Sequence, residues 1–501
     1  MDEDDRLSID ESRPDAPFLG GDLNADDQSR DTAKPWQIAT TSRAISTVAC
    51  VAVFLWVLSG MIIVVPAARL AEDIICRRHY GRFDSDPIDE ELCKAKEIQS
   101  SMAWIFGLSM SLGTIVGLIA MIPYGVLADR ARKPVYLLAA TGQFANVSWS
   151  LLVLRFWRTL PFELILVGPT LELIGGGLTM ALVVLYAIIS DANAPEDRAI
   201  IYFFSSLAAN LAVFIGPPLA SFMIETSSPW VPMSFSLLAT TLAGSIILLI
   251  PETARRSKDL RGNHEDSRVA RDQGWRIAIM SQLRGIFSDS NLVSVLRKRS
   301  VLLLLLVFIL TAPLQLGMGP LFLQYYSKRF EKSIEEAGYM LALRGGLTII
   351  VVGVLLPVLS KYISSSSFVR LSNFRRDLVL AQASAVFAGI GYFLLGGPEK
   401  ASLISGIVIL SLSTGLGPLG RSLISNLVEP SQTSQVFTIA SIVEGIGSLP
   451  AGPFLAWAFS CGMRLGGVWM GLPFFFLGSL GGLALLVLCF VKSKPLTTGG
   501  G

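Results

Sequence analysis

Residues 123–139 read PYGVLADRARKPVYLLA, a short polar and basic segment between two long apolar stretches. These stretches, 99–123 and 135–155, are long enough to cross the ~30 Å hydrocarbon core of a bilayer, which takes ~20 predominantly apolar residues. Lipid offers the backbone no hydrogen-bonding partners, so such a stretch crosses it as a helix. The segment therefore predicts a turn between two membrane-spanning helices.

The same pattern continues in both directions along the chain, whose 501 residues are 52% hydrophobic and only 16% charged. This composition carries more apolar surface than one water-soluble core can bury, which indicates that the bilayer is the solvent. The length rule predicts an all-α, polytopic membrane protein with twelve transmembrane helices. We expect the spans near 45–66, 99–123, 135–155, 161–189, 199–224, 231–250, 301–325, 336–360, 378–396, 402–427, 435–460 and 466–491.

Polar segments divide these spans into two groups of six. Residues 1–42 are acidic and lack the basic start and apolar core of a secretory signal, so we expect a disordered cytoplasmic tail. Residues 251–300 are too polar to span and too short for an ordinary domain, which predicts a cytoplasmic connector. The expected domains are therefore two six-helix bundles, 43–250 and 301–492, followed by a C-terminal tail, 493–501.

Two stretches in corresponding places look like copies of each other. ISDANAPEDRAIIYFFSSLAANLAVFIGPPLASF occupies 189–222, and ISNLVEPSQTSQVFTIASIVEGIGSLPAGPFLAW occupies 424–457. Gly216 of the first stretch aligns with Gly452 of the second. Transporters are commonly built from internal repeats, so we predict a duplicated six-helix unit and pseudo-symmetric bundles.

The loop at 123–139 also has a recognisable spacing, in which Gly125 begins a turn, Asp129 follows four residues later, and Arg130 and Arg132 come next. This pattern resembles the cytoplasmic signature of the major facilitator superfamily. The resemblance implies a gating loop whose carboxylate accepts hydrogen bonds from basic side chains and stabilises the state closed to the cytoplasm. The alternative is that the basic residues only orient the helix, because arginine and lysine accumulate in cytoplasmic loops.

Longer segments, VVPAARLAEDIIC, GRSLISNLVEP and GLPFFF among them, are similar to fungal carriers related to proton-coupled folate carriers and tetracycline-type exporters. In the fifth span, Gly216 and Pro217 of GPPLASF resemble the glycine-proline signature of antiporter-type exporters. A proline kink with small residues for close helix packing explains the same letters equally well.

Four ionisable residues lie at membrane depth, where each costs roughly 3 kcal/mol and tends to face a wet cavity or a partner. They are Glu172, Arg344, Arg421 and Glu444. We expect them to be candidates for proton or substrate coupling, with an Arg421–Glu444 ion pair that a proton or an anionic substrate could break. The alternative is that they lock helices together or extend toward the membrane surface.

Cysteine and histidine usage bears on the loop between the first two spans. Cys76 and Cys93 fall in this loop and could form a disulfide in an oxidising exterior, although two free thiols or a bridge to Cys461 remain open. The histidines, His79 and His264, form no ligand spacing with the cysteines. We therefore expect neither a metal site nor a cofactor.

Together these features predict a secondary active transporter that works by alternating access. We expect proton-coupled efflux of a small organic metabolite or toxin at the plasma membrane, or at the vacuolar membrane, with both termini in the cytoplasm. One alternative is proton-coupled uptake of an organic anion or nutrient, with Arg344 and Arg421 as clamps. Another is a membrane receptor without transport.

Other function classes find little support in the sequence. No GxSxG, HExxH or phosphate-binding loop is present, so we do not expect an enzyme. A net charge of +2 spread along the chain argues against nucleic-acid binding. The expected partners are a small-molecule substrate, protons and the lipid bilayer, and the expected state is a monomer.

Overall fold

Apolar helices dominate the structure. A computed structural model describes residues 41–83, 88–194, 197–253, 298–355, 358, 373–428 and 433–492. Every regular element in these ranges is a helix, which confirms the predicted all-α fold class. Most of the two predicted tails and of the predicted connector lies outside the described residues. Large apolar side chains cover the outside of the bundle, for example Ile119 (59% exposed) and Phe222 (57%), as expected of a surface that faces lipid.

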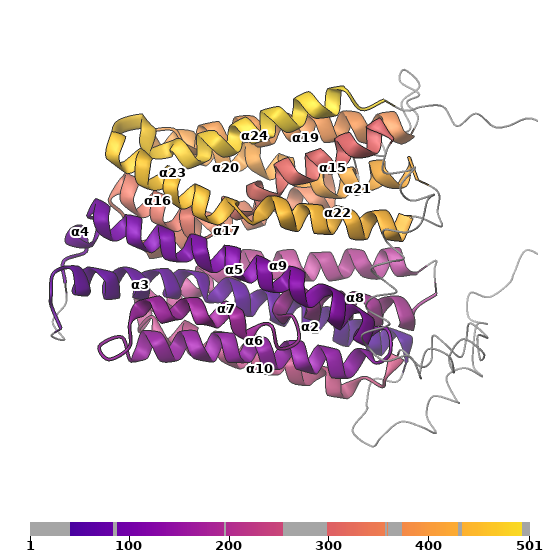
Figure 1. Ribbon diagram of the computed structural model, residues 1–501, viewed down its shortest axis with the longest axis horizontal. Helices are drawn as coiled ribbons and strands as arrows, with labels where there is room; N and C mark the ends of the chain where they lie inside the picture. Colours follow the sequence, from indigo (N-terminus) through magenta and orange to yellow (C-terminus); the bar gives the residue numbers. More distant parts are fainter. Residues whose placement is uncertain are drawn as a thin grey trace, which may run out of the picture.

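The first six spans lie on one side of the molecule, coloured indigo to pink in Figure 1. Their helices are α2 (Ser42–Ile62), α3 (Val64–His79), α4 (Glu90–Cys93), α5 (Lys96–Ala128), α6 (Arg132–Arg155), η1 (Phe162–Leu166), α7 (Val167–Leu171), α8 (Gly177–Ala192), α9 (Arg198–Thr226), α10 (Trp230–Ser245) and η2 (Ile246–Leu249).

The last six spans lie on the other side, coloured orange to yellow. Their helices are α15 (Arg299–Thr311), η3 (Ala312–Leu316), α16 (Pro320–Phe330), α17 (Ile334–Ile350), η4 (Val351–Leu355), α19 (Asn373–Leu395), α20 (Lys400–Ser411), η5 (Leu412–Gly415), α21 (Leu416–Ser425), α22 (Thr433–Ser448), α23 (Ala451–Leu465), η6 (Gly467–Gly471) and α24 (Leu472–Cys489).

Eleven described helices are long and apolar enough to cross a membrane, and the predicted fourth span is not among them. Two shorter apolar helices, Phe162–Leu171 and Gly177–Ala192, replace the single helix expected at 161–189. The cause is the glycine run at 175–177, whose φ angles of 84°, 83° and 57° lie in the left-handed region that glycine adopts readily. The prediction of one continuous fourth helix was wrong.

The first span is longer than predicted. α2 and α3 form a single membrane-length helix, Ser42–His79, of 38 residues, where we expected a span ending at residue 66 and then a loop. The charged residues after position 66 look like a loop in the sequence, but Glu72 among them is only 1% exposed. Burial against other helices, with the charge paired, allows this segment to remain helical.

The two ends of the molecule are packed differently. We call the end that holds Cys76 and Cys93 the disulfide end, and the opposite one the Asp129 end. At the disulfide end one apolar core contains residues of both halves, such as Phe322 and Met102. Elsewhere each half has an apolar core of its own. The core of the first half is built from residues in the range 45–250, and that of the second half from residues in the range 301–491. The halves are therefore joined by apolar packing mainly at the disulfide end.

Candidate functional site

A cavity of about 400 Å³ lies between the two halves. α9 of the first half contributes Asn210 and Pro217, and the second half contributes Gln315, Arg344 and Glu444. Most of the lining is apolar or uncharged. A cavity of this size, with a few polar groups at the interface of two bundles, is the usual form of a small-molecule site.

The cavity is closed at the disulfide end by helices that touch backbone to backbone. A Cβ atom at Gly107 of α5 would lie 2.5 Å from the carbonyl oxygen of Gly452 in α23. Only glycine fits at such a crossing, which is the small-residue packing common between membrane helices. α5 belongs to the first half and α23 to the second, so this contact closes the interface between them.

A cluster of buried polar side chains, here called the disulfide-end cluster, lies at the same end of the molecule. Lys94 Nζ lies 2.8 Å and 3.0 Å from the two carboxylate oxygens of Glu72. Gln99 Nε2 donates to Glu72 Oε1 at 2.7 Å. Each of these side chains is less than 10% exposed and belongs to the first half. The strongest charge pairing in the cluster is thus internal to one half.

Two further members of the cluster lie in the second half. Lys94 Nζ donates to Ser327 Oγ at 2.6 Å, and Arg69 Nε lies 3.5 Å from Glu335 Oε1. The contacts of this cluster that cross the halves are therefore a hydrogen bond to the neutral hydroxyl of Ser327 and a long ion pair between Arg69 and Glu335. Separating the halves would leave the buried charge of Glu72 paired with Lys94, which avoids the large penalty of an uncompensated buried ion.

Cys76 and Cys93 form a disulfide, with an S–S distance of 2.05 Å and a Cα–Cα distance of 5.1 Å. The bond joins α3 to the end of α4. Cys93 directly precedes Lys94, so the bond holds Lys94 next to Glu72. Cys461, which we considered as another partner, is free.

The predicted gating loop lies at the opposite end. Asp129 Oδ1 is 3.1 Å from Arg132 Nη1, and Arg132 Nε is 3.1 Å from Asp191 Oδ2. The backbone N–H groups of Arg132 and Lys133 donate to the carboxylate of Glu252 at 2.9 Å and 3.1 Å. These partners lie within the first six spans or directly after them, and none belongs to the second half.

The turn itself begins later than predicted. Gly125 lies within the last turn of α5, and its carbonyl accepts the N–H of Asp129 at 3.1 Å. The expectation that Gly125 begins the turn was therefore wrong, because the helix continues to Ala128. Asp129 and Arg130 follow at the surface, and the side chain of Asp129 is 63% exposed.

The four candidate coupling residues do not form two pairs. Arg421 Nη2 lies 3.3 Å from Glu444 Oε2, across α21 and α22, and Glu444 lines the cavity. Glu172 lies at the break in the fourth span, away from the lining, and accepts a hydrogen bond from Asn146 Nδ2 at 2.5 Å. Arg344 lines the cavity and has no ion pair among the described residues.

Gly216 and Pro217 lie inside α9. A Cβ atom at Gly216 would lie 2.6 Å from Met61 Cβ in α2, so this glycine permits close packing of two helices. Pro217 lines the cavity. Gly216 is therefore a helix-packing residue, and Pro217, directly after it, forms part of the cavity wall.

Comparison with known proteins agrees with this architecture. The model of the Major Facilitator Superfamily matches residues 47–452. The chain belongs to the major facilitator superfamily. The resemblance noted in the 123–139 loop is thereby confirmed.

Relatives of this major facilitator protein include fungal transporters. The chain is 28% identical to the MFS efflux pump atnC of Emericella nidulans, with 82% of this chain and 80% of the relative covered. It is 26% identical to the MFS-type transporter aprT of Aspergillus flavus, covering 96% and 94%. A D-xylose-proton symporter structure superposes with a TM-score of 0.63 at 13% identity, covering 90% of this chain and 98% of the other.

Sequence reasoning missed two features of this superfamily member. The disulfide-end cluster was overlooked because Glu72, Lys94 and Gln99 were assigned to a solvated loop or its edge. The only available signal was that acidic and basic residues there are nearly balanced. The break in the fourth span was overlooked because glycine counts as apolar in a search for membrane spans, although three in a row disfavour a helix.

Proposed function

We propose that the protein is a secondary active transporter that exports a small organic metabolite by alternating access, coupled to protons. The observation that carries this proposal is the position of the cavity between two halves that share a core at one end only. Such an arrangement is the one expected of a transporter caught with one side closed.

We assign the Asp129 end to the cytoplasm and the disulfide end to the outside. The support is the basic character of the 123–139 loop and the presence of a disulfide, which forms in oxidising compartments. In this orientation the state described is open toward the cytoplasm, the plasma membrane is the site of export, and Asp129 is released from the second half.

The proposed coupling residue is Glu444. Its carboxylate lines the cavity and pairs with Arg421, which is half exposed. A proton on Glu444 would remove its attraction to Arg421, and the Arg421 guanidinium would then be free to bind cargo. Glu172 is a second proton acceptor in this proposal, because it lies at an irregular backbone segment inside the membrane.

The direction of export is proposed by analogy with relatives, since atnC and ustT, a protein of Aspergillus flavus, are both called efflux pumps. The test compares metabolites in deletion and overexpressing strains. Export predicts that deletion raises the internal level of the cargo and that overexpression lowers it. A lower internal level in the deletion strain would refute export.

Uptake of an organic anion is a second candidate, and Arg344 is the observation that favours it. Its guanidinium lies on the cavity wall without an ion pair among the described residues, so an anionic ligand would supply the missing charge. The same strain comparison distinguishes the candidates, because uptake predicts less cargo inside the deletion strain. Arg421 is no longer proposed as a clamp, since Glu444 already pairs with it.

A further inference from the structure

Gln324 of α16 carries a buried amide at the disulfide end, where α5 and α23 close the cavity. We call this closed region the barrier. Gln324 is 1% exposed. Neither its amide nitrogen nor its amide oxygen has a hydrogen-bond partner in the described part of the chain. Buried amides are almost always paired, because leaving one unpaired sacrifices the hydrogen bonds it makes with water.

Gln99, the other buried glutamine at this end, differs from Gln324 in its hydrogen bonding. Gln99 is fully buried, and its amide nitrogen donates to Glu72 at 2.7 Å and to the carbonyl of Cys93 at 3.1 Å. Both bonds lie within the first half, and of this amide only the oxygen lacks a partner in the described part of the chain. Gln324, placed at the same end, contributes no such bond.

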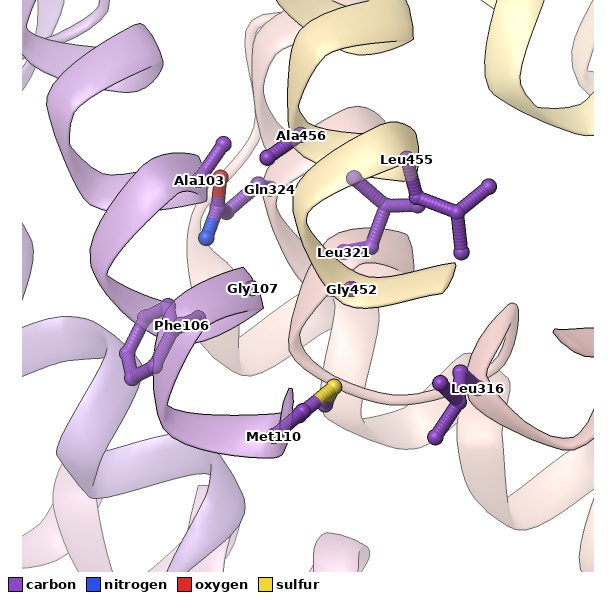
Figure 2. Close-up of a pocket in the computed structure, with 10 residues that line it drawn as sticks. All are labelled: Ala103, Phe106, Gly107, Met110, Leu316, Leu321, Gln324, Gly452, Leu455 and Ala456. Carbon is purple, nitrogen blue, oxygen red and sulfur yellow. The ribbon is translucent and has the colours of Figure 1, made fainter. Parts of the chain in front are cut away.

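A small cavity of about 20 Å³ lies beside Gln324. Figure 2 shows the amide between α5 and α23, with Ala103 and Gly107 on one side and Gly452 and Ala456 on the other. A cavity of this volume holds one water molecule, and the amide supplies a donor and an acceptor for it. The rest of the lining is apolar, so such a water is poorly satisfied there.

We propose that Gln324 destabilises the closed barrier and so favours its opening. In the closed state the amide has at most one water as its partner. When α5 and α23 separate, the cavity joins the transport pathway, and the amide gains full hydrogen bonding from solvent or from a polar group of the cargo. This inference rests on the alternating access proposed above, and it adds the residue that sets the balance between the two states.

The test replaces Gln324 by methionine, which has nearly the same shape but cannot form these hydrogen bonds. Purified protein is melted in detergent, and opening is followed in cells through an Ala103→Cys reporter labelled by a membrane-impermeant maleimide. Ala103 is 3% exposed, so its labelling requires the barrier to open. The same background without the reporter corrects for Cys461 and the other free cysteines.

We expect Gln324→Met to raise the melting temperature and to slow labelling of the reporter by about fivefold or more, because an unpaired amide is removed from the closed state. Gln324→Leu should act in the same direction. The matched control, Gln99→Met, should lower the melting temperature, since it removes two buried hydrogen bonds within the first half.

Two outcomes would overturn the proposal in different ways. An unchanged or lower melting temperature in both Gln324 variants, or labelling at the rate of the parent, would refute the role of Gln324 alone. A reporter that is never labelled, in parent or variants, would show that this end does not open. That result would refute alternating access and the inference with it.

Discussion

Glu444 is a charged residue that both lines the cavity and links two helices through an ion pair. Its carboxylate belongs to the cavity wall and also forms the ion pair with Arg421 at 3.3 Å. The pair could be anticipated because the two residues lie on sequential helices at similar depth. Its position on the cavity wall could not, because which side of a helix faces the partner half depends on the packing of all twelve spans.

Replacing Glu444 by glutamine should abolish proton-coupled transport while the protein still folds. The amide keeps the size of the side chain but cannot change its charge, so protonation no longer switches the contact with Arg421. The measurement is proton movement, detected with a pH-sensitive dye in proteoliposomes, when a cargo gradient is imposed. Glu399→Gln, at an exposed position, is the control and should behave as the parent. Full proton coupling in Glu444→Gln would exclude this residue from the mechanism.

The broken fourth span is the most unusual element of the molecule. Its glycine run allows the backbone to turn and to approach α6 closely, since a Cβ atom at Gly175 would lie 2.2 Å from the carbonyl carbon of Leu138. Irregular backbone within a membrane is tolerated only where protein or a wet cavity surrounds it. Here the protein surrounds it, because residues 175–177 are buried.

Gly175→Ala should lower the free energy of unfolding by about 1–3 kcal/mol, because alanine is strained at a φ of 84°. The clash with Leu138 adds to this effect. Gly113→Ala is the matched control, since Gly113 lies in the regular helix α5 with open space around it. That change should be neutral or stabilising by up to ~1 kcal/mol. Equal melting temperatures for the two variants would contradict the role assigned to the glycine run.

In the proposed transport cycle, the balance between the two states depends on contacts that cross the halves. Arg69 illustrates the distinction. Its acidic partners Glu72 and Glu90 belong to its own half, and Glu335 belongs to the other. In the proposed cycle only the contact with Glu335 must break when the disulfide end opens.

Glu335→Gln should therefore speed maleimide labelling of an Ala103→Cys reporter, by roughly fivefold for each ~1 kcal/mol of ion pairing lost. Glu90→Gln removes a partner of Arg69 within its own half and should leave the labelling rate near that of the parent. The expected sign is opposite to that for Gln324→Met. Faster labelling in Glu90→Gln than in Glu335→Gln would mean that cross-half pairing does not hold this end closed.

Most of the spans and their order followed from composition and length, because lipid leaves a chain few other choices. The break in the fourth span did not. The features that close the molecule did not follow. Glu72 and Lys94 looked like loop residues, since nothing in one sequence shows that a charge will be paired and buried. Nothing in the sequence distinguishes Gln324, and its lack of partners is a property of the packed structure alone.

The single-ended core has a consequence for how protons can be handled. In the proposed cycle, a cavity closed at the disulfide end would expose the Glu444 carboxylate only to the compartment at the Asp129 end. When the closure changed ends, the same carboxylate would face the opposite compartment, and it would never face both at once. On this proposal, the backbone contact between Gly107 and Gly452 would prevent a continuous proton leak.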